Sequence, residues 1–122
     1  MKLHAAGPTP YNTITGYGDD HVMVNGQRRD SSLIVMADRL VPWDAGNFAG
    51  LTPENFAFLK NLDVEIILLG TGAKQRFPHP RLTAPLSSAG VGLEVMDLKA
   101  ACRTYNILAA EERKVAAALL FG

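Results

Sequence analysis

The chain of 122 residues is poor in cysteine and carries no net charge. A single cysteine, Cys102, excludes an intrachain disulfide and favours a reducing compartment. The 12 Lys and Arg residues balance the 12 Asp and Glu residues, so the composition predicts no nucleic-acid partner and no attraction to an anionic membrane. No apolar run approaches the roughly 20 residues that a membrane-spanning helix needs, so no membrane span is predicted.

The amino-terminal residues show neither a signal peptide nor a transit pattern, which predicts a cytoplasmic protein. Hydrophobic residues make up 48% of the chain, enough for the core of one domain. We therefore expect a single domain over residues 1–122. Its first part, residues 1–12, is rich in Gly and Pro and is predicted to form an extended segment.

The first third of the chain shows the pattern of β-hairpins. Residues 13–24 alternate around Gly18-Asp19-Asp20, and Asn25-Gly26 is a second strong turn signal. The returning strand of that second hairpin is predicted at Ser32–Met36, whose unbroken apolar run indicates burial on both faces. Pro42 cannot donate to a sheet, so residues 39–43 are expected at an edge or outside the sheet.

The middle of the chain is organised around the apolar run Val64–Gly72, which we interpret as a buried central strand. A helix before it is predicted from Thr52 as N-cap and Pro53 as its first residue. Further helices are predicted over residues 81–89 and from about residue 98, with Asp97 as N-cap, and a strand over residues 91–96. For the tail, residues 109–120, propensity favours a helix, whereas a buried terminal strand is the alternative.

This order of elements predicts an α/β fold with a mixed sheet. Strands that alternate with helices from Leu33 to Met96 favour parallel pairing, and the hairpins at the start add antiparallel strands. Because ligands of such folds lie at the carboxyl ends of strands, we place the candidate site after residue 69.

The loop Gly70-Thr71-Gly72 is the main candidate for ligand binding. Two glycines permit a sharp turn and expose N–H groups to an anion, but neither a dinucleotide fingerprint nor a P-loop is complete. A structural turn is the favoured interpretation, and an anion-binding loop is the alternative. The polar residues that could join such a site are Lys74, Gln75, Arg76 and Arg103.

Other reactive side chains give weaker signals. Cys102 lies on the apolar stripe of the last predicted helix, which indicates a buried thiol and not a nucleophile. His4, His21 and His79 lack metal-ligand spacing, and His79 is interpreted as an accessible loop residue. Thr104 and Asn106 are placed off the stripe, either on the surface or paired with carboxylates such as Glu111. No catalytic residue, metal or cofactor is predicted.

Several segments together resemble a known family. This is the small domain of unknown function shared by many bacterial proteins, which also includes a mitochondrial complex I assembly factor and an adipogenesis-associated domain-containing protein. The resemblance covers nearly the whole chain. It is carried by Asp30 to Val35 with Trp43, by Leu68 to Gly72 with Gln75 and Phe77, by Gly90 to Met96, and by Ala100 to Glu111 followed by Arg113 and residues 115–120.

The resemblance implies a three-layer α/β fold with a mixed central sheet, and a tail from about Arg113 that is a strand of that sheet. We adopt this over the propensity argument. It also implies a non-enzymatic interaction or assembly factor with protein partners, linked to respiratory complexes. The alternative is a small-molecule or nucleotide-binding protein, or an enzyme, that uses the Gly70–Gly72 loop. Homo-oligomer formation is left open.

Overall fold

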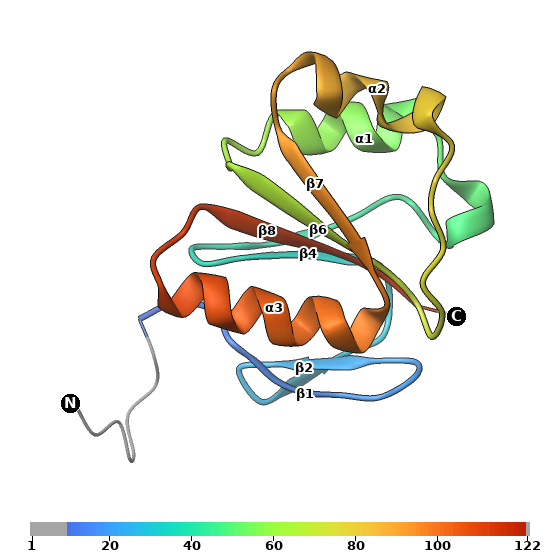
Figure 1. The fold of residues 1–122 in the computed structure, drawn as a ribbon. Coiled ribbons are helices and arrows are strands. Elements are labelled where there is room, and N and C mark those ends of the chain that lie inside the picture. Colours follow the sequence, from blue (N-terminus) through green and yellow to red (C-terminus); the bar gives the residue numbers. More distant parts are fainter. Residues whose placement is uncertain (1–9, 122) are drawn as a thin grey trace.

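A five-stranded mixed sheet forms the centre of the structure (Figure 1). The computed structural model describes residues 10–121, so most of the predicted extended segment 1–12 lies outside the described residues. The strand order is β5-β4-β8-β6-β7. These strands are β4 (Leu33–Met36), β5 (Leu40–Pro42), β6 (Ile66–Thr71), β7 (Gly92–Met96) and β8 (Val115–Leu120).

The carboxyl-terminal strand β8 occupies the middle of this sheet. All six of its residues are buried, with Val115 at 3% exposure and the others at 0%. Three of the six, Ala116 to Ala118, are alanines, which would favour a helix in isolation. Tertiary packing overrides that propensity, because a strand covered on both faces must be apolar and small side chains let both layers approach. The strand implied by the family resemblance is confirmed. The run Val64–Gly72, interpreted as a buried central strand, contains β6, which is buried and lies between β8 and β7, although the middle position of the sheet belongs to β8.

The pairing makes the sheet mixed, as predicted. β6 pairs in parallel with both β8 and β7, whereas β4 pairs antiparallel with β8 and with β5. β5 is an edge strand that ends at Pro42, in agreement with its sequence.

Helices cover both faces of the sheet and create two apolar clusters (Figure 1). Helix α1 (Pro53–Lys60) and helix α2 (Pro80–Ser88) pack on one face, with a 3-10 turn, η1 (Phe48–Gly50), before them. Helix α3 (Leu98–Ala110) packs on the other face, together with a small antiparallel sheet. That sheet has the order β1-β2-β3, formed by β1 (Ile14–Tyr17), β2 (Val22–Val24) and β3 (Gln27–Arg29).

The second hairpin differs from its prediction. Asn25 and Gly26 form the turn with positive φ values of 53° and 81°, but the chain returns at once as β3, not as Ser32–Met36. A two-residue turn requires the partner strand to begin directly after it. The Leu33–Met36 run is buried on both faces and therefore joins the large sheet as β4.

The helix starts follow the sequence signals. Thr52 and Asn55 form a capping box at α1, and the Asp97 carboxylate accepts from the N–H of Ala100 at α3. Helix α2 begins one residue before the predicted start, at Pro80.

Two side chains of α3 fasten the small sheet to the rest of the fold. The Tyr105 hydroxyl donates to the carbonyl of Asn12 at 2.8 Å, and burial raises the pKa of this hydroxyl. The Asn106 amide donates to the Ile14 carbonyl at 2.8 Å and accepts from the Ile14 N–H at 3.0 Å. Asn106 thus replaces a neighbouring strand along the outer edge of β1, and the predicted surface or carboxylate pairing of this residue is wrong.

Candidate functional site

The predicted loop Gly70-Thr71-Gly72 lies where β6 ends, and glycine is required at its two positions for different structural reasons. A Cβ at Gly70 would lie 3.1 Å from both the Ala101 Cβ and the Leu119 Cδ2, so Gly70 allows α3 to pack directly on β6. Gly72 has a φ of +93°, which other residues rarely adopt. The turn is therefore made at Gly72, whereas Gly70 is still part of the strand.

Thr71 and Arg76 close this loop on itself. The Thr71 side chain is fully buried, accepts from the Arg76 N–H at 3.0 Å and donates to the Lys74 carbonyl at 2.5 Å. The Arg76 guanidinium donates to the Thr71 carbonyl at 2.9 Å and lies 4.6 Å from the centre of the Phe48 ring. Both side chains thus have contacts within the protein that hold the loop in shape.

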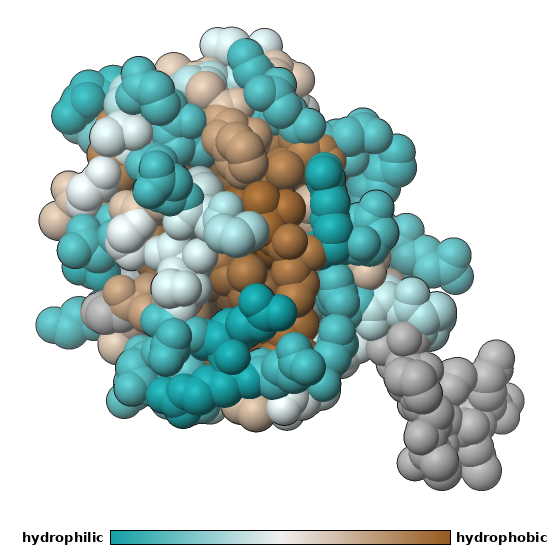
Figure 2. Space-filling model, turned by 180° about the vertical axis from the view of Figure 1, so that it is seen from behind, coloured by the Kyte–Doolittle hydropathy of each residue, from teal (hydrophilic) through white to brown (hydrophobic). Residues whose placement is uncertain are grey.

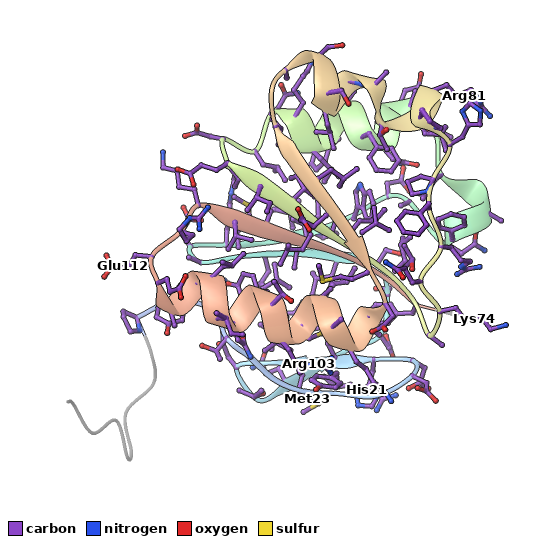
Figure 3. All side chains as sticks on the ribbon, in the orientation of Figure 1. His21, Met23, Lys74, Arg81, Arg103 and Glu112 are labelled. Atoms are coloured by element: carbon purple, nitrogen blue, oxygen red, sulfur yellow. The ribbon has the colours of Figure 1, made fainter. Side chains whose placement is uncertain are left out.

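The other predicted residues are spread over a wider area (Figure 3). Lys74 is exposed and points away from the body of the protein, and Gln75 donates to the Val95 carbonyl at 2.9 Å. Arg103 lies 3.4 Å from the Tyr17 hydroxyl, and this hydrogen bond raises its pKa. Of these residues, Gly72 and Arg103 line a common cavity, of about 290 Å³, beside the start of α3.

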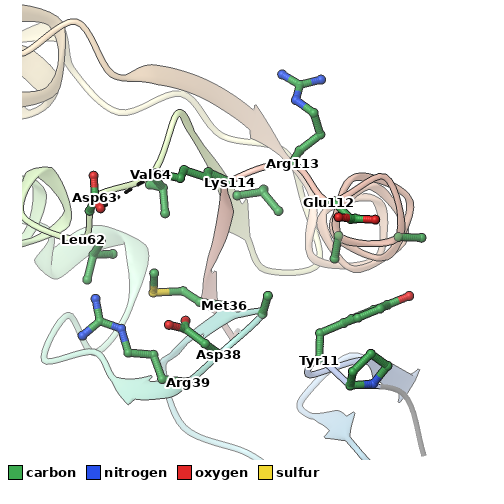
Figure 4. Close-up of a pocket in the computed structure, with 15 residues that line it drawn as sticks. Tyr11, Met36, Asp38, Arg39, Leu62, Asp63, Val64, Glu112, Arg113 and Lys114 are labelled. Atoms are coloured by element: carbon green, nitrogen blue, oxygen red, sulfur yellow. Dashed lines mark ion pairs between the residues drawn. The ribbon is translucent and has the colours of Figure 1, made fainter.

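A much larger cavity, of about 700 Å³, lies at the opposite end of the strands, where β4 ends and β8 begins. Apolar side chains gather in a hollow on the back of the molecule, between hydrophilic borders (Figure 2). In the close-up, Met36 lies at the centre and charged side chains surround it (Figure 4). The apolar part of the lining includes Met36, Leu62, Val64 and Val115, and the charged rim consists of Asp38, Arg39, Asp63, Glu112, Arg113 and Lys114.

The rim carries equal numbers of cations and anions, and some of them are paired. Lys114 lies 4.0 Å from Asp63, and Arg113 lies 3.5 Å from Glu65, just outside the lining. Asp63 and Glu112 have positive φ values of 59° and 61°. A non-glycine residue at such a position is strained, and strained residues cluster at functional sites. Two carboxylates are therefore held at the rim of one cavity in conformations that glycine would adopt more easily.

Sequence reasoning missed this cavity because it is assembled from separate turns. Residues 10–11, 36–39, 62–64, 109–110 and 112–115 meet only after the sheet has formed. The one available signal was the charged run Glu111-Glu112-Arg113-Lys114 directly before a buried strand.

The other side chains that were considered as reactive groups, Cys102 and His79, have structural roles. Burial raises the pKa of the Cys102 thiol to about 12, so it stays protonated at neutral pH. His79 is the N-cap of α2, where its Nδ1 accepts from the Arg81 N–H at 3.1 Å, so it is not simply a loop residue. Within residues 10–121, no three His, Cys, Asp or Glu side chains cluster as a metal site would require. Over the same range no helix has the length and hydrophobicity to cross a bilayer.

The mixed sheet, its helix-covered faces and the small hairpin sheet define an α/β domain that has been seen before. A crystal structure from Bordetella parapertussis superposes with a TM-score of 0.86 at 37% identity, covering 95% of this chain and all of that one. The chain belongs to the family described as "Protein of unknown function (DUF498/DUF598)", which matches residues 14–120.

Curated relatives include both assembly factors and uncharacterised bacterial proteins. NADH dehydrogenase (ubiquinone) 1 alpha subcomplex assembly factor 3 of Bos taurus is 30% identical over 109 residues, which are 88% of this chain and 59% of that protein. This chain thus spans little more than half of that relative. An uncharacterised protein of Rhodobacter capsulatus is 32% identical over 117 residues, covering 94% of this chain and 86% of the relative.

Proposed function

We propose that this chain is a non-enzymatic interaction or assembly factor that binds a client protein of a respiratory complex. The proposal is carried by one observation, the 30% identity to an assembly factor across 88% of this chain. A cytoplasmic location, protein partners and the absence of a nucleic-acid partner belong to the same proposal.

The large cavity supports this proposal as the place where a client would dock. Its floor of Met36, Leu62 and Val64 offers apolar surface, and its rim offers charges of both signs. Protein-binding sites of this kind combine an apolar centre, which contributes affinity, with a polar border, which contributes specificity.

The test is deletion of the gene in its native cell, followed by native gels and quantitative mass spectrometry of the membrane respiratory complexes. We expect one complex to be depleted and its subassemblies to accumulate, with recovery when the wild-type gene is restored. Unchanged complexes would refute the proposal.

A matched pair of variants connects this result to the cavity. Ala110 is exposed at the end of α3 and lines the cavity, so Ala110→Arg should fill it without disturbing the core. Ala84 is also exposed on a helix, α2, and serves as the control. Ala84→Arg should restore assembly and Ala110→Arg should not, while both keep the wild-type Tm.

The second candidate is binding of a small anion or nucleotide at the Gly70–Gly72 loop. The observation in its favour is the cavity of about 290 Å³ that joins Gly72 to the cations Lys99 and Arg103. A bound ligand raises apparent stability by mass action, so thermal shift with phosphate, ATP and NAD is the test. We expect no shift, because Asp19 and Asp97 also line this cavity and Lys99 already lies 3.4 Å from Asp19; a rise that is lost in Arg103→Ala would favour the second candidate.

A further inference from the structure

The strand edges of this protein differ in how they are protected. At one edge of the large sheet, the Trp43 N–H donates inward to the Ser32 carbonyl, so Pro42 faces outward and presents no N–H. In the small sheet, Asn106 covers the outward N–H and carbonyl of Ile14 on β1. These are ordinary devices against unwanted strand pairing. The remaining edge of the large sheet is β7, a five-residue strand without proline.

The backbone of β7 presents hydrogen-bonding groups to solvent. The Gly92 N–H donates to the Glu65 carbonyl at 3.1 Å, which fixes the alternation of the parallel pair. Gly92, Glu94 and Met96 therefore turn their backbone groups toward β6, and Leu93 and Val95 turn theirs outward. The side-chain amide of Gln75 donates a hydrogen bond to the Val95 carbonyl at 2.9 Å. The Leu93 N–H, the Leu93 carbonyl and the Val95 N–H remain directed away from the sheet, and Figure 1 shows no described strand beyond β7.

The side chains of β7 specify which strand could pair there. Leu93 and Val95 pack against the cluster under α1 and α2, so Glu94 projects from the opposite face, where it is exposed. If a second copy of this chain paired antiparallel with β7 through the outward backbone groups of Leu93 and Val95, Glu94 of one copy would lie directly opposite Glu94 of the other. Like charges at that position destabilise the pair, and an opposite charge stabilises it.

We propose that β7 takes up an extended segment of a client protein as a sixth strand, with a Lys or Arg opposite Glu94. This inference rests on the proposed function, because it gives the interaction factor a second contact surface, apart from the large cavity, and names the kind of client segment that would bind there. Main-chain hydrogen bonds from Leu93 and Val95 would supply affinity, and the charge of Glu94 would supply selectivity.

The test is selection of short displayed peptides on the immobilised full chain and on its Glu94→Lys variant. Wild type should select β-branched sequences with a central Lys or Arg, and Glu94→Lys should select a central Asp or Glu. A selected basic peptide should bind Glu94→Lys about tenfold more weakly. The reason is that the charge directly opposite the basic side chain of the peptide changes from attractive to repulsive. Glu111→Lys, the same change at the exposed end of α3, should bind that peptide as wild type does.

Amide hydrogen exchange of the peptide complex locates the binding. Bound peptide should slow exchange at Leu93 and Val95 while the amides of β5 are unchanged. Peptides that protect other amides, identical selections on wild type and Glu94→Lys, or dimerisation of the free chain through β7 would each overturn the inference.

The deletion strain separates this inference from the proposed function. Unchanged complexes in the deletion strain would refute the proposed function, and the peptide experiment would still decide the role of β7. If the wild-type gene and the Glu94→Lys gene restored assembly equally, the proposed function would stand and β7 would not be its docking edge.

Discussion

Removing the Asn106 amide should loosen the small sheet from α3. In Asn106→Ala, the N–H and carbonyl of Ile14 lose their partners at 3.0 and 2.8 Å in a half-buried position. A net hydrogen bond contributes about 1 kcal/mol, and an unsatisfied buried group costs about 1–3 kcal/mol. Because water reaches part of this site, we expect a loss of about 2–3 kcal/mol in the free energy of unfolding, measured by urea denaturation.

Two further variants test the reasoning behind that number. Ile107 is the next residue on α3 and is 59% exposed, so Ile107→Ala should stay within about 0.5 kcal/mol of wild type. Asn106→Asp keeps an acceptor for the Ile14 N–H but places a carboxylate against the Ile14 carbonyl. That arrangement favours the protonated acid in the folded state, so the variant should lose stability as pH rises, unlike wild type. An Asn106→Ala protein as stable as Ile107→Ala would refute the strand-replacing role of Asn106.

Three other changes have expected outcomes of their own. Gly70→Ala places a Cβ 3.1 Å from Ala101 and Leu119 and should lower the free energy of unfolding by about 1–3 kcal/mol in urea denaturation, with client binding lost only in proportion to the unfolded fraction. Native Cys102 should alkylate slowly, and its rate should still be rising at pH 10, where an ordinary thiol has levelled off, because its pKa is raised to about 12; rapid labelling at neutral pH would contradict its burial. Glu112→Gly relieves a φ of 61° and should raise stability by about 1 kcal/mol, yet weaken client binding if the cavity is the docking site.

Local signals in the sequence predicted the helix starts and the turns well. Thr52, Asp97 and Asn25-Gly26 act within a few residues of themselves, so no tertiary context could change their outcome. The tail was different, because the alanine-rich residues 115–120 have helical propensity and only burial on two faces makes them a strand. Propensity alone could not supply that information, whereas the resemblance of the chain to a family of known fold could.

The candidate site was harder to predict because side-chain partners are not written in the sequence. Thr71 and Arg76 were selected as candidate ligand-binding residues because they are polar and lie near a glycine turn. In the structure, these two residues form hydrogen bonds with each other. Asn106 was placed on the surface or in a pair with a carboxylate, although it binds backbone groups 92 residues away. Contacts of such range depend on the docking of α3, which no local pattern of one chain records.

The position of the large cavity follows from the mixed character of the sheet. Ligands of parallel sheets lie at the carboxyl ends of the strands, which is why the loop after β6 was chosen. Strand β4, however, runs antiparallel to β8, and its last residue, Met36, pairs with Ala116 near the start of β8. The carboxyl end of β4 therefore lies at the same end of the sheet as the amino ends of β6 and β8. Carboxyl ends of strands thus occur at both ends of this sheet, and the larger cavity lies at the end where β4 terminates.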